Sequence, residues 1–402
     1  MIELKTAAYR RASFALALGS FLVFCNLYMF QPMLPLMAEK FNASAIEINW
    51  LLASCTLTLA LTLVPWAVIS EIIGRRKVMM VSLFLLPFTG MAMLLTDSLM
   101  MLTLMRGVMG IALAGFVAVA VAYMAEEFTA KAFMIAVGGY ISANSLGGIS
   151  GRLYGGFVTQ YWGWNVAVVG MAISSLFGAL LVYRLLPEQQ HFTPKKGQFR
   201  NHNKRVVGHL KQRELWVAML IGGLNFALIV NLYTVMGFRL IAPPYSLSIS
   251  LTSMIFLCYL SGTISAKLSG RWSQYYSPVK GMMLGTTVSA IGMCIAAYDS
   301  LYAMVIGLLL IGSGAFFTHS LAYAWVSQKA KVAKATATAL YLVHYYVGGS
   351  LGGFYLIACW QYGAWYGVLA GGMVLYGLIY LLCWRLHCHT THNFKRINNH
   401  GS

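Results

Sequence analysis

Arg106 is the residue of this sequence whose position most needs a chemical explanation. It lies about eight residues, roughly 12 Å, inside an apolar stretch at residues 99–123. If that stretch crosses a bilayer, the charge costs about 2.5–3.5 kcal/mol and lies too deep to reach the surface easily. Two roles remain open: a cavity cation that binds an anionic group or steers proton coupling, and a clamp that donates hydrogen bonds to carbonyls of neighbouring helices. Arg152 lies nearer the outer end of its stretch, so two positions stay open for its side chain: inside the membrane, or extended to the membrane surface. Arg239 and Lys267 lie near opposite ends of their stretches, and we expect them to be anchors at the membrane surface.

Titratable groups inside the apolar stretches are few. His319 and His344 are the only histidines there, and histidine changes charge near physiological pH. Either histidine could carry a coupling proton, or be a neutral hydrogen-bonding partner of a neighbouring helix. All ten acidic residues fall at or beyond the ends of the stretches. An interior with Arg106 but without a carboxylate favours an anionic, zwitterionic or neutral solute over a cationic one.

Sequence signals for cofactors and for catalysis are missing. The seven cysteines are scattered without a CxxC pair, so neither a zinc site nor a disulfide framework is indicated. There is no Walker-type phosphate loop, and no nucleophile, metal cluster or carboxylate pair that could support catalysis near the membrane surface. We therefore expect no cofactor, no bound metal and no enzymatic activity.

Composition places these residues in a membrane. Hydrophobic residues make up 59% of the chain and charged residues 9%, with a mean hydropathy of +0.71. Soluble domains carry about 25% charged residues, and so few charges cannot cover a water-exposed surface of this size. The net charge of +18 does not indicate nucleic-acid binding, because the cations cluster between apolar stretches. The lipid bilayer is therefore the expected solvent of most of the chain.

Twelve stretches are long enough to span a bilayer as helices. They lie near 14–38, 47–69, 78–96, 99–123, 132–158, 164–186, 214–241, 247–270, 279–297, 300–326, 335–358 and 363–386. With the N-terminus inside, 24 of the 28 Lys and Arg residues fall on the cytoplasmic side. This bias predicts cytoplasmic termini and a cytoplasmic central linker.

The two halves of the chain repeat. Asp97-Ser98-Leu99 recurs as Asp299-Ser300-Leu301, a shift of 202 residues, and Tyr140 matches Tyr341 at a shift of 201. Glycines 147, 148 and 151 match glycines 348, 349 and 352 at the same shift of 201. The order and near-constant offset predict an all-α membrane protein of two pseudo-symmetric six-helix bundles. We expect bundles at 1–186 and 214–386, a basic cytoplasmic linker at 187–213 and a cytoplasmic tail at 387–402.

Three motifs carry a family resemblance. The run Ala67-x-x-x-Glu71-x-x-Gly74-Arg75-Arg76-Lys77 resembles the signature loop of the major facilitator superfamily, and Arg106-x-x-x-Gly110 is similar to its buried arginine motif. Ala143-Asn144-Ser145-Leu146-Gly147-Gly148 occupies the place of the antiporter motif, without that motif's glycine-proline pair. Ala67, Glu71 and Ile72 also depart from the signature. Within that superfamily the chain resembles bacterial inner-membrane permeases of the YnfM type, a group described as efflux permeases.

The resemblance implies roles for individual residues. In this family spans 1, 5 and 7 line the cavity, so amides there are substrate-site candidates or ties between helices: Asn26, Gln31, Asn144, Asn225 and Asn231. The motif match favours the cavity role of Arg106. Ion pairs between cations and carboxylates of the loop would close the inner gate, with Gly74 in the turn between the helices. The alternative is that the charged residues are ordinary loop charges. The candidate gate residues are Glu71, Gly74, Arg75, Arg76, Glu126 and Glu127. The glycine pairs would be hinges or close contacts between helices: Gly147, Gly148, Gly348 and Gly349.

We thus expect a monomeric secondary transporter of the bacterial inner membrane that works by alternating access. It would export an anionic, zwitterionic or neutral small molecule, coupled to protons, and bind no nucleic acid. One alternative is a proton-coupled uptake symporter for a nutrient anion. An alternative of another class is a sensor or scaffold that has lost transport.

Overall fold

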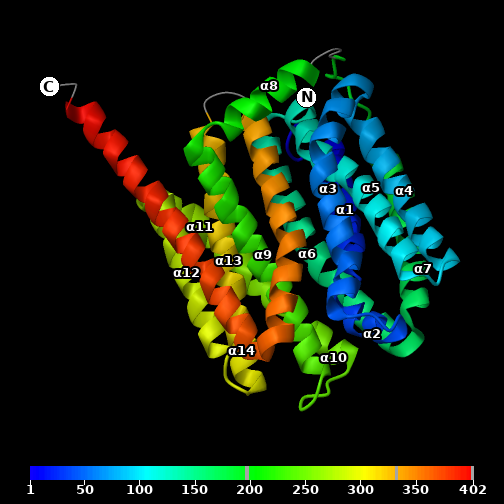
Figure 1. Cartoon of the computed structure of the whole chain (residues 1–402). Helices are drawn as coiled ribbons and strands as arrows, with labels where there is room; N and C mark the ends of the chain where they lie inside the picture. The colour runs from blue at the N-terminus through cyan, green and yellow to red at the C-terminus, as the bar shows by residue number, and fades with distance from the viewer. Residues whose placement is uncertain (195–198, 331–333, 400–402) are drawn as a thin grey trace. The chain divides into compact units, whose positions relative to one another are not determined.

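The computed structural model describes residues 1–194, 199–330 and 334–399, and in these residues helices joined by short turns account for nearly all of the chain (Figure 1). Among the described residues, eleven helical segments are long and apolar enough to cross a membrane. The last of them, Thr336–Cys388, is interrupted by non-helical dihedral angles at Gly363 and Ala364, so it supplies two spans. The predicted all-α membrane fold with twelve spans is confirmed.

The helices follow the predicted stretches. The first seven are α1 (Ala7–Tyr28), α2 (Leu34–Lys40), α3 (Ala45–Ile73), α4 (Arg75–Ala92), α5 (Leu99–Glu127), α6 (Ala130–Trp162) and α7 (Trp164–Leu185). The next seven are α8 (Phe199–Leu210), α9 (Arg213–Ile241), α10 (Ile249–Ser253), α11 (Tyr259–Tyr275), α12 (Pro278–Ile295), α13 (Leu301–Lys329) and α14 (Lys334–Asn399). Short 3₁₀ turns lie at Gln31–Met33, Met93–Leu95 and Met254–Cys258.

The chain divides into two compact units. The first unit comprises Met1–Arg200 with Met236–Phe256, and the second comprises Asn201–Val235 with Leu257–Ser402. The predicted bundle boundaries at 186 and 214 stay a prediction.

Two predicted spans are broken in the structure. The expected helix at 14–38 ends at Tyr28 and resumes as α2 after a 3₁₀ turn that contains Pro32, because proline has no N–H to continue the helical ladder. The expected helix at 247–270 is split into α10, a 3₁₀ turn and α11. The linker predicted at 187–213 contains a helix, α8, while its Lys195 and Lys196 lie outside the described residues.

Helix α6 packs against α1 through small residues. A Cβ atom added at Gly151 would lie 2.5 Å from the carbonyl oxygen of Cys25, and one at Gly147 would overlap the carbonyl oxygen of Phe21. In the second unit, Gly348 of α14 approaches the backbone of Gly223 on α9 in the same way. Glycine is therefore required for close helix contact at these positions, and a hinge role for the glycine pairs stays a prediction.

Candidate functional site

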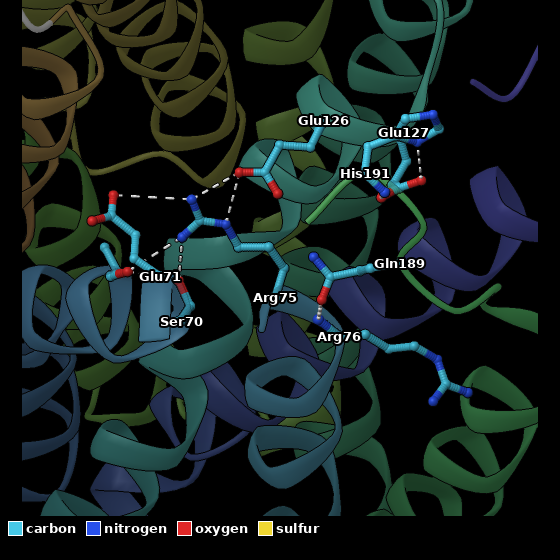
Figure 2. Close-up of polar contacts among 9 residues, drawn as sticks. Ser70, Glu71, Arg75, Arg76, Glu126, Glu127, Gln189 and His191 are labelled. Atoms are coloured by element: carbon cyan, nitrogen blue, oxygen red, sulfur yellow. Dashed lines mark hydrogen bonds and ion pairs between the residues drawn. The ribbon is translucent and has the colours of Figure 1, made fainter. Parts of the chain in front are cut away.

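The loop between α3 and α4 is built around Gly74. Its φ of +105° is open to glycine and strained for other residues, and it ends α3 one residue before Arg75 begins α4. A Cβ atom at this position would lie 3.0 Å from Oε1 of Gln189, so the glycine also leaves room for that side chain. The turn thereby directs two consecutive arginines to different partners (Figure 2).

Arg75 lies between two carboxylates, as Figure 2 shows. Its Nη2 is 2.8 Å from Oε1 of Glu126 and 3.9 Å from Oε1 of Glu71, and its Nε donates to the same Glu126 oxygen at 3.1 Å. Its Nη1 donates to the hydroxyl of Ser70 at 2.5 Å. The Arg75 side chain is 11% exposed, so this pairing is partly shielded from water. We call Ser70, Glu71, Arg75 and Glu126 the loop cluster.

Arg76 binds the segment that follows α7. Its backbone N–H donates to Oε1 of Gln189 at 3.0 Å, and its guanidinium donates to the carbonyls of Leu186 and Tyr183 at 3.0 and 2.8 Å. Of the two predicted gate arginines, only Arg75 is brought to carboxylates in the described contacts. Arg76 instead fixes the start of the linker to the first unit.

Glu127 also binds that segment. It is 2% exposed, and its carboxylate accepts the N–H groups of Gln190 and His191 at 3.0 Å each and lies 3.0 Å from Nδ1 of His191. Neighbouring Glu126 and Glu127 thus have separate tasks, one toward the loop cation and one toward the linker. The pattern of two adjacent glutamates did not reveal this division.

Arg106 is fully buried within the first unit. Its Nε donates to the carbonyl of Leu51 on α3, and its Nη1 and Nη2 donate to the carbonyls of Asn26 and Leu27 on α1, at 2.8 to 3.0 Å. The guanidinium also lies 4.7 Å from the ring centre of Phe30. This geometry has the form of the interhelical clamp, and a role in substrate binding stays a prediction.

Arg152 is also buried within the first unit. It is 4% exposed, its Nε donates to Oε1 of Gln31 at 2.6 Å, and its guanidinium lies 3.8 Å from the ring centre of Tyr28. Of the two positions left open for it, the structure has the one inside the unit, because the missing side chain of Gly148, one turn before it, leaves room for the guanidinium. That i, i+4 spacing is the sequence signal that could have revealed it. Arg239, 6% exposed, is also buried, whereas Lys267 is exposed as expected.

The candidate amides tie helices together. Asn26 donates to the hydroxyl of Ser175 on α7 at 2.8 Å, and Asn144 accepts a hydrogen bond from Ser20 on α1. In the second unit, Asn231 donates to the carbonyl of Gly349 at 2.8 Å. Asn225 likewise donates to a carbonyl of α13. The structure therefore supports the helix-joining interpretation, while substrate binding by these amides stays a prediction.

The two candidate histidines differ in their surroundings. Nδ1 of His319 lies 2.9 Å from the hydroxyl of Tyr341, and the His319 ring lies 4.2 Å from that of Tyr345. Nδ1 of His344 lies 2.8 Å from the carbonyl of Leu340 in its own helix. His319 is therefore joined to a second titratable side chain, which the sequence did not indicate.

Known proteins resemble this chain over nearly its whole length. The model of the Major Facilitator Superfamily matches residues 16–353. The inner membrane transport protein YnfM of Escherichia coli is 31% identical, with 96% of this chain and 93% of YnfM covered. The uncharacterized MFS-type transporter YybF of Bacillus subtilis is 30% identical over 94% of this chain and 93% of its own.

Solved structures share the fold at low sequence identity. The structure of a bacterial homologue of the human lysosomal transporter Spinster has a TM-score of 0.72 at 14% identity and covers 96% of this chain and 97% of that chain. A D-xylose–proton symporter has a TM-score of 0.72 at 15% identity, with 93% and 96% covered. The proteins of this superfamily are transporters and not enzymes. This chain is a multi-pass membrane transporter that belongs to the Major Facilitator Superfamily.

Proposed function

We propose that the chain exports an anionic, zwitterionic or neutral small molecule across the bacterial inner membrane in exchange for protons, as a monomer working by alternating access. The observation that carries this proposal is a pair of buried guanidinium groups, Arg106 and Arg152, in a chain whose acidic residues all fall at or beyond the ends of the predicted spans. Buried charge in a membrane protein commonly marks a solute or proton pathway.

Arg152 is the proposed cation for the solute. Its planar guanidinium suits carboxylate and phosphate groups, which it can bind through two parallel hydrogen bonds. Gln31 and the ring of Tyr28 already hold it in position, so binding would need little reordering of the side chain. Arg106, whose donors point at three carbonyls, would maintain the architecture around it.

His319 is the proposed proton carrier. Its hydrogen bond with Tyr341 gives a protonated imidazole a hydroxyl that can accept the hydrogen bond, and that can relay a proton by releasing its own. The loop cluster is the proposed inner gate, since a partly shielded ion pair can be made and broken at modest cost during a transport cycle.

Everted membrane vesicles test the direction and the coupling. Vesicles from cells that produce the chain are given an acidic lumen and incubated with a metabolite extract, and the lumenal contents are identified by mass spectrometry. Export predicts accumulation that stops when a protonophore collapses the gradient and that is lost in Arg152→Gln. Vesicles from cells with the Arg184→Gln variant, an exposed position at the end of α7, are the control and should still accumulate the solute.

The alternatives give different results in the same experiment. Accumulation only in right-side-out vesicles with an acidic exterior would replace export by uptake symport. A chain that accumulates no solute in either orientation, although correctly folded, would be a sensor or scaffold.

A further inference from the structure

The second unit contains a cavity that is lined by none of the residues proposed for the solute, the proton or the gate. Its volume is about 420 Å³, and it is formed by the beginning of α9, the last residue of α13 and residues 382–386 of α14. In the predicted topology these three segments lie on one side of the membrane, the side of the central linker and the C-terminal tail. The cavity is therefore located at the boundary between lipid and water.

Three cations from three helices surround the cavity: Arg213 of α9, Lys329 of α13 and Arg385 of α14. One carboxylate joins them, since Oε2 of Glu214 lies 2.7 Å from Nζ of Lys329. The N–H of Trp216 donates to the carbonyl of Gln212, and this is the first hydrogen bond of the α9 ladder. The backbone N–H groups before Trp216 therefore have no acceptor within the helix, and they add partial positive charge at the cavity. The mouth of the cavity thus carries an excess of positive charge.

The remaining wall is apolar. Leu215 and Leu386 are buried, and Trp216 is 43% exposed beside them. A small hydrophilic anion would contact only the charged rim. A molecule with an anionic head and hydrocarbon chains would contact both surfaces.

The internal repeat relates the end of α13 at this cavity to the end of α5 in the first unit. Lys329 and Glu127 are related by the shift of 202 residues and are each the last residue of a 29-residue helix, α13 and α5. In the first unit the carboxylate of Glu127 binds the N–H groups of Gln190 and His191, so the chain itself occupies that position. In the second unit a cation stands there, beside an open cavity.

We propose that this cavity binds the phosphodiester headgroup of an anionic phospholipid, with its acyl chains along Trp216 and Leu382. Cationic pockets at the ends of membrane helices attract such headgroups, and each cation near the surface contributes to the attraction. The apolar wall is the reason to assign a lipid rather than free phosphate. The inference is independent of the transported solute and of the direction of transport.

Quenching of Trp216 by brominated lipid tests the proposal. The purified full-length chain in detergent is titrated with dibromo-phosphatidylglycerol, and the signal of Trp216 is the difference from the Trp216→Phe variant, since the chain has ten tryptophans. We expect quenching at lower lipid concentration than with dibromo-phosphatidylcholine, which has no net charge. In the double variant Arg213→Gln with Arg385→Gln, the concentration of dibromo-phosphatidylglycerol that gives half-maximal quenching should rise by about fivefold for each cation removed.

The matched control is Arg184→Gln with Lys280→Gln. Both residues are exposed, lie on the same predicted side of the membrane and are outside the cavity, so this pair removes the same charge and should leave quenching unchanged. Equal quenching by the two lipids, or an equal loss in the control, would overturn the proposal. Displacement of the brominated lipid by the same concentration of inorganic phosphate would assign the cavity to free phosphate instead. If the double variant folds poorly, Arg385→Gln alone gives the test at about fivefold.

Discussion

Arg106 and Arg152 are both buried cations, yet the groups that they bind differ. Arg106 donates to three backbone carbonyls on two other helices, and such acceptors cannot move away without moving the helices. Arg152 donates to one backbone carbonyl, that of Gly148 in its own helix, and otherwise contacts the side chains of Gln31 and Tyr28, which can change rotamer. This difference is consistent with the proposed division of tasks, in which Arg106 holds helices together and Arg152 binds the solute.

Replacing Arg106 by Gln should therefore lower stability as well as transport. Several charge-assisted hydrogen bonds are lost and buried carbonyls lose their donors, which costs on the order of 3 kcal/mol. Thermal unfolding in detergent can be followed with a thiol-reactive dye, because Cys25, Cys55 and Cys258 are buried until the chain unfolds. Arg184→Gln should unfold at the wild-type temperature. An Arg106→Gln variant as stable as wild type but inactive would show instead that Arg106 acts on the solute.

The pairing of Arg75 with Glu126 can be measured by a double-mutant cycle. With the arginine 11% and the glutamate 31% exposed, solvent screens the pair, so a coupling of about 0.5–1 kcal/mol is expected in stability. The singles Arg75→Gln and Glu126→Gln should both slow transport, and the double variant should be little worse than either. Lys77→Gln, an exposed cation two residues from Arg75, is the control. Additive losses in the double variant would mean that the two residues act separately.

Among the helices, α1 and α6 make the contact that depends most on residue size. Gly151→Ala places a methyl group against the backbone of Cys25, at 2.5 Å from its carbonyl oxygen, so the helices must separate. A loss of about 1–3 kcal/mol and a lower unfolding temperature are expected. Gly139→Ala in the same helix meets nothing within 4 Å and should be neutral or slightly stabilising. If both variants unfold at the same temperature, α1 and α6 do not depend on this close approach.

The number of membrane-spanning helices could be predicted from the lengths of the apolar stretches, but not every interruption of those helices could be predicted. Gly363 and Ala364 separate the last two spans as expected, whereas the break after Tyr28 depends on Pro32 and on contacts that a hydropathy window averages away. Side-chain partners are harder still. Asn26, Asn144 and Arg106 could be singled out by residue type and depth, but the carbonyl or hydroxyl that each one binds is decided by the packing of helices distant in sequence.

For the whole molecule, the internal repeat and the charge bias predict one topology, with both termini and the central linker in the cytoplasm. Cysteine labelling tests it directly. In a background with Cys294→Ser and Cys388→Ser, the two exposed cysteines, a single cysteine replaces either Tyr362, 94% exposed between the last two spans, or Tyr276, 61% exposed between α11 and α12. A membrane-impermeant maleimide should label Tyr362→Cys in spheroplasts and Tyr276→Cys only in everted vesicles. The reverse pattern would invert the molecule and, with it, the direction assigned to transport. Labelling of both sites from one side would mean an even number of crossings between them, against the three predicted, and would contradict the twelve-span arrangement, since an odd number of spans must separate positions on opposite faces.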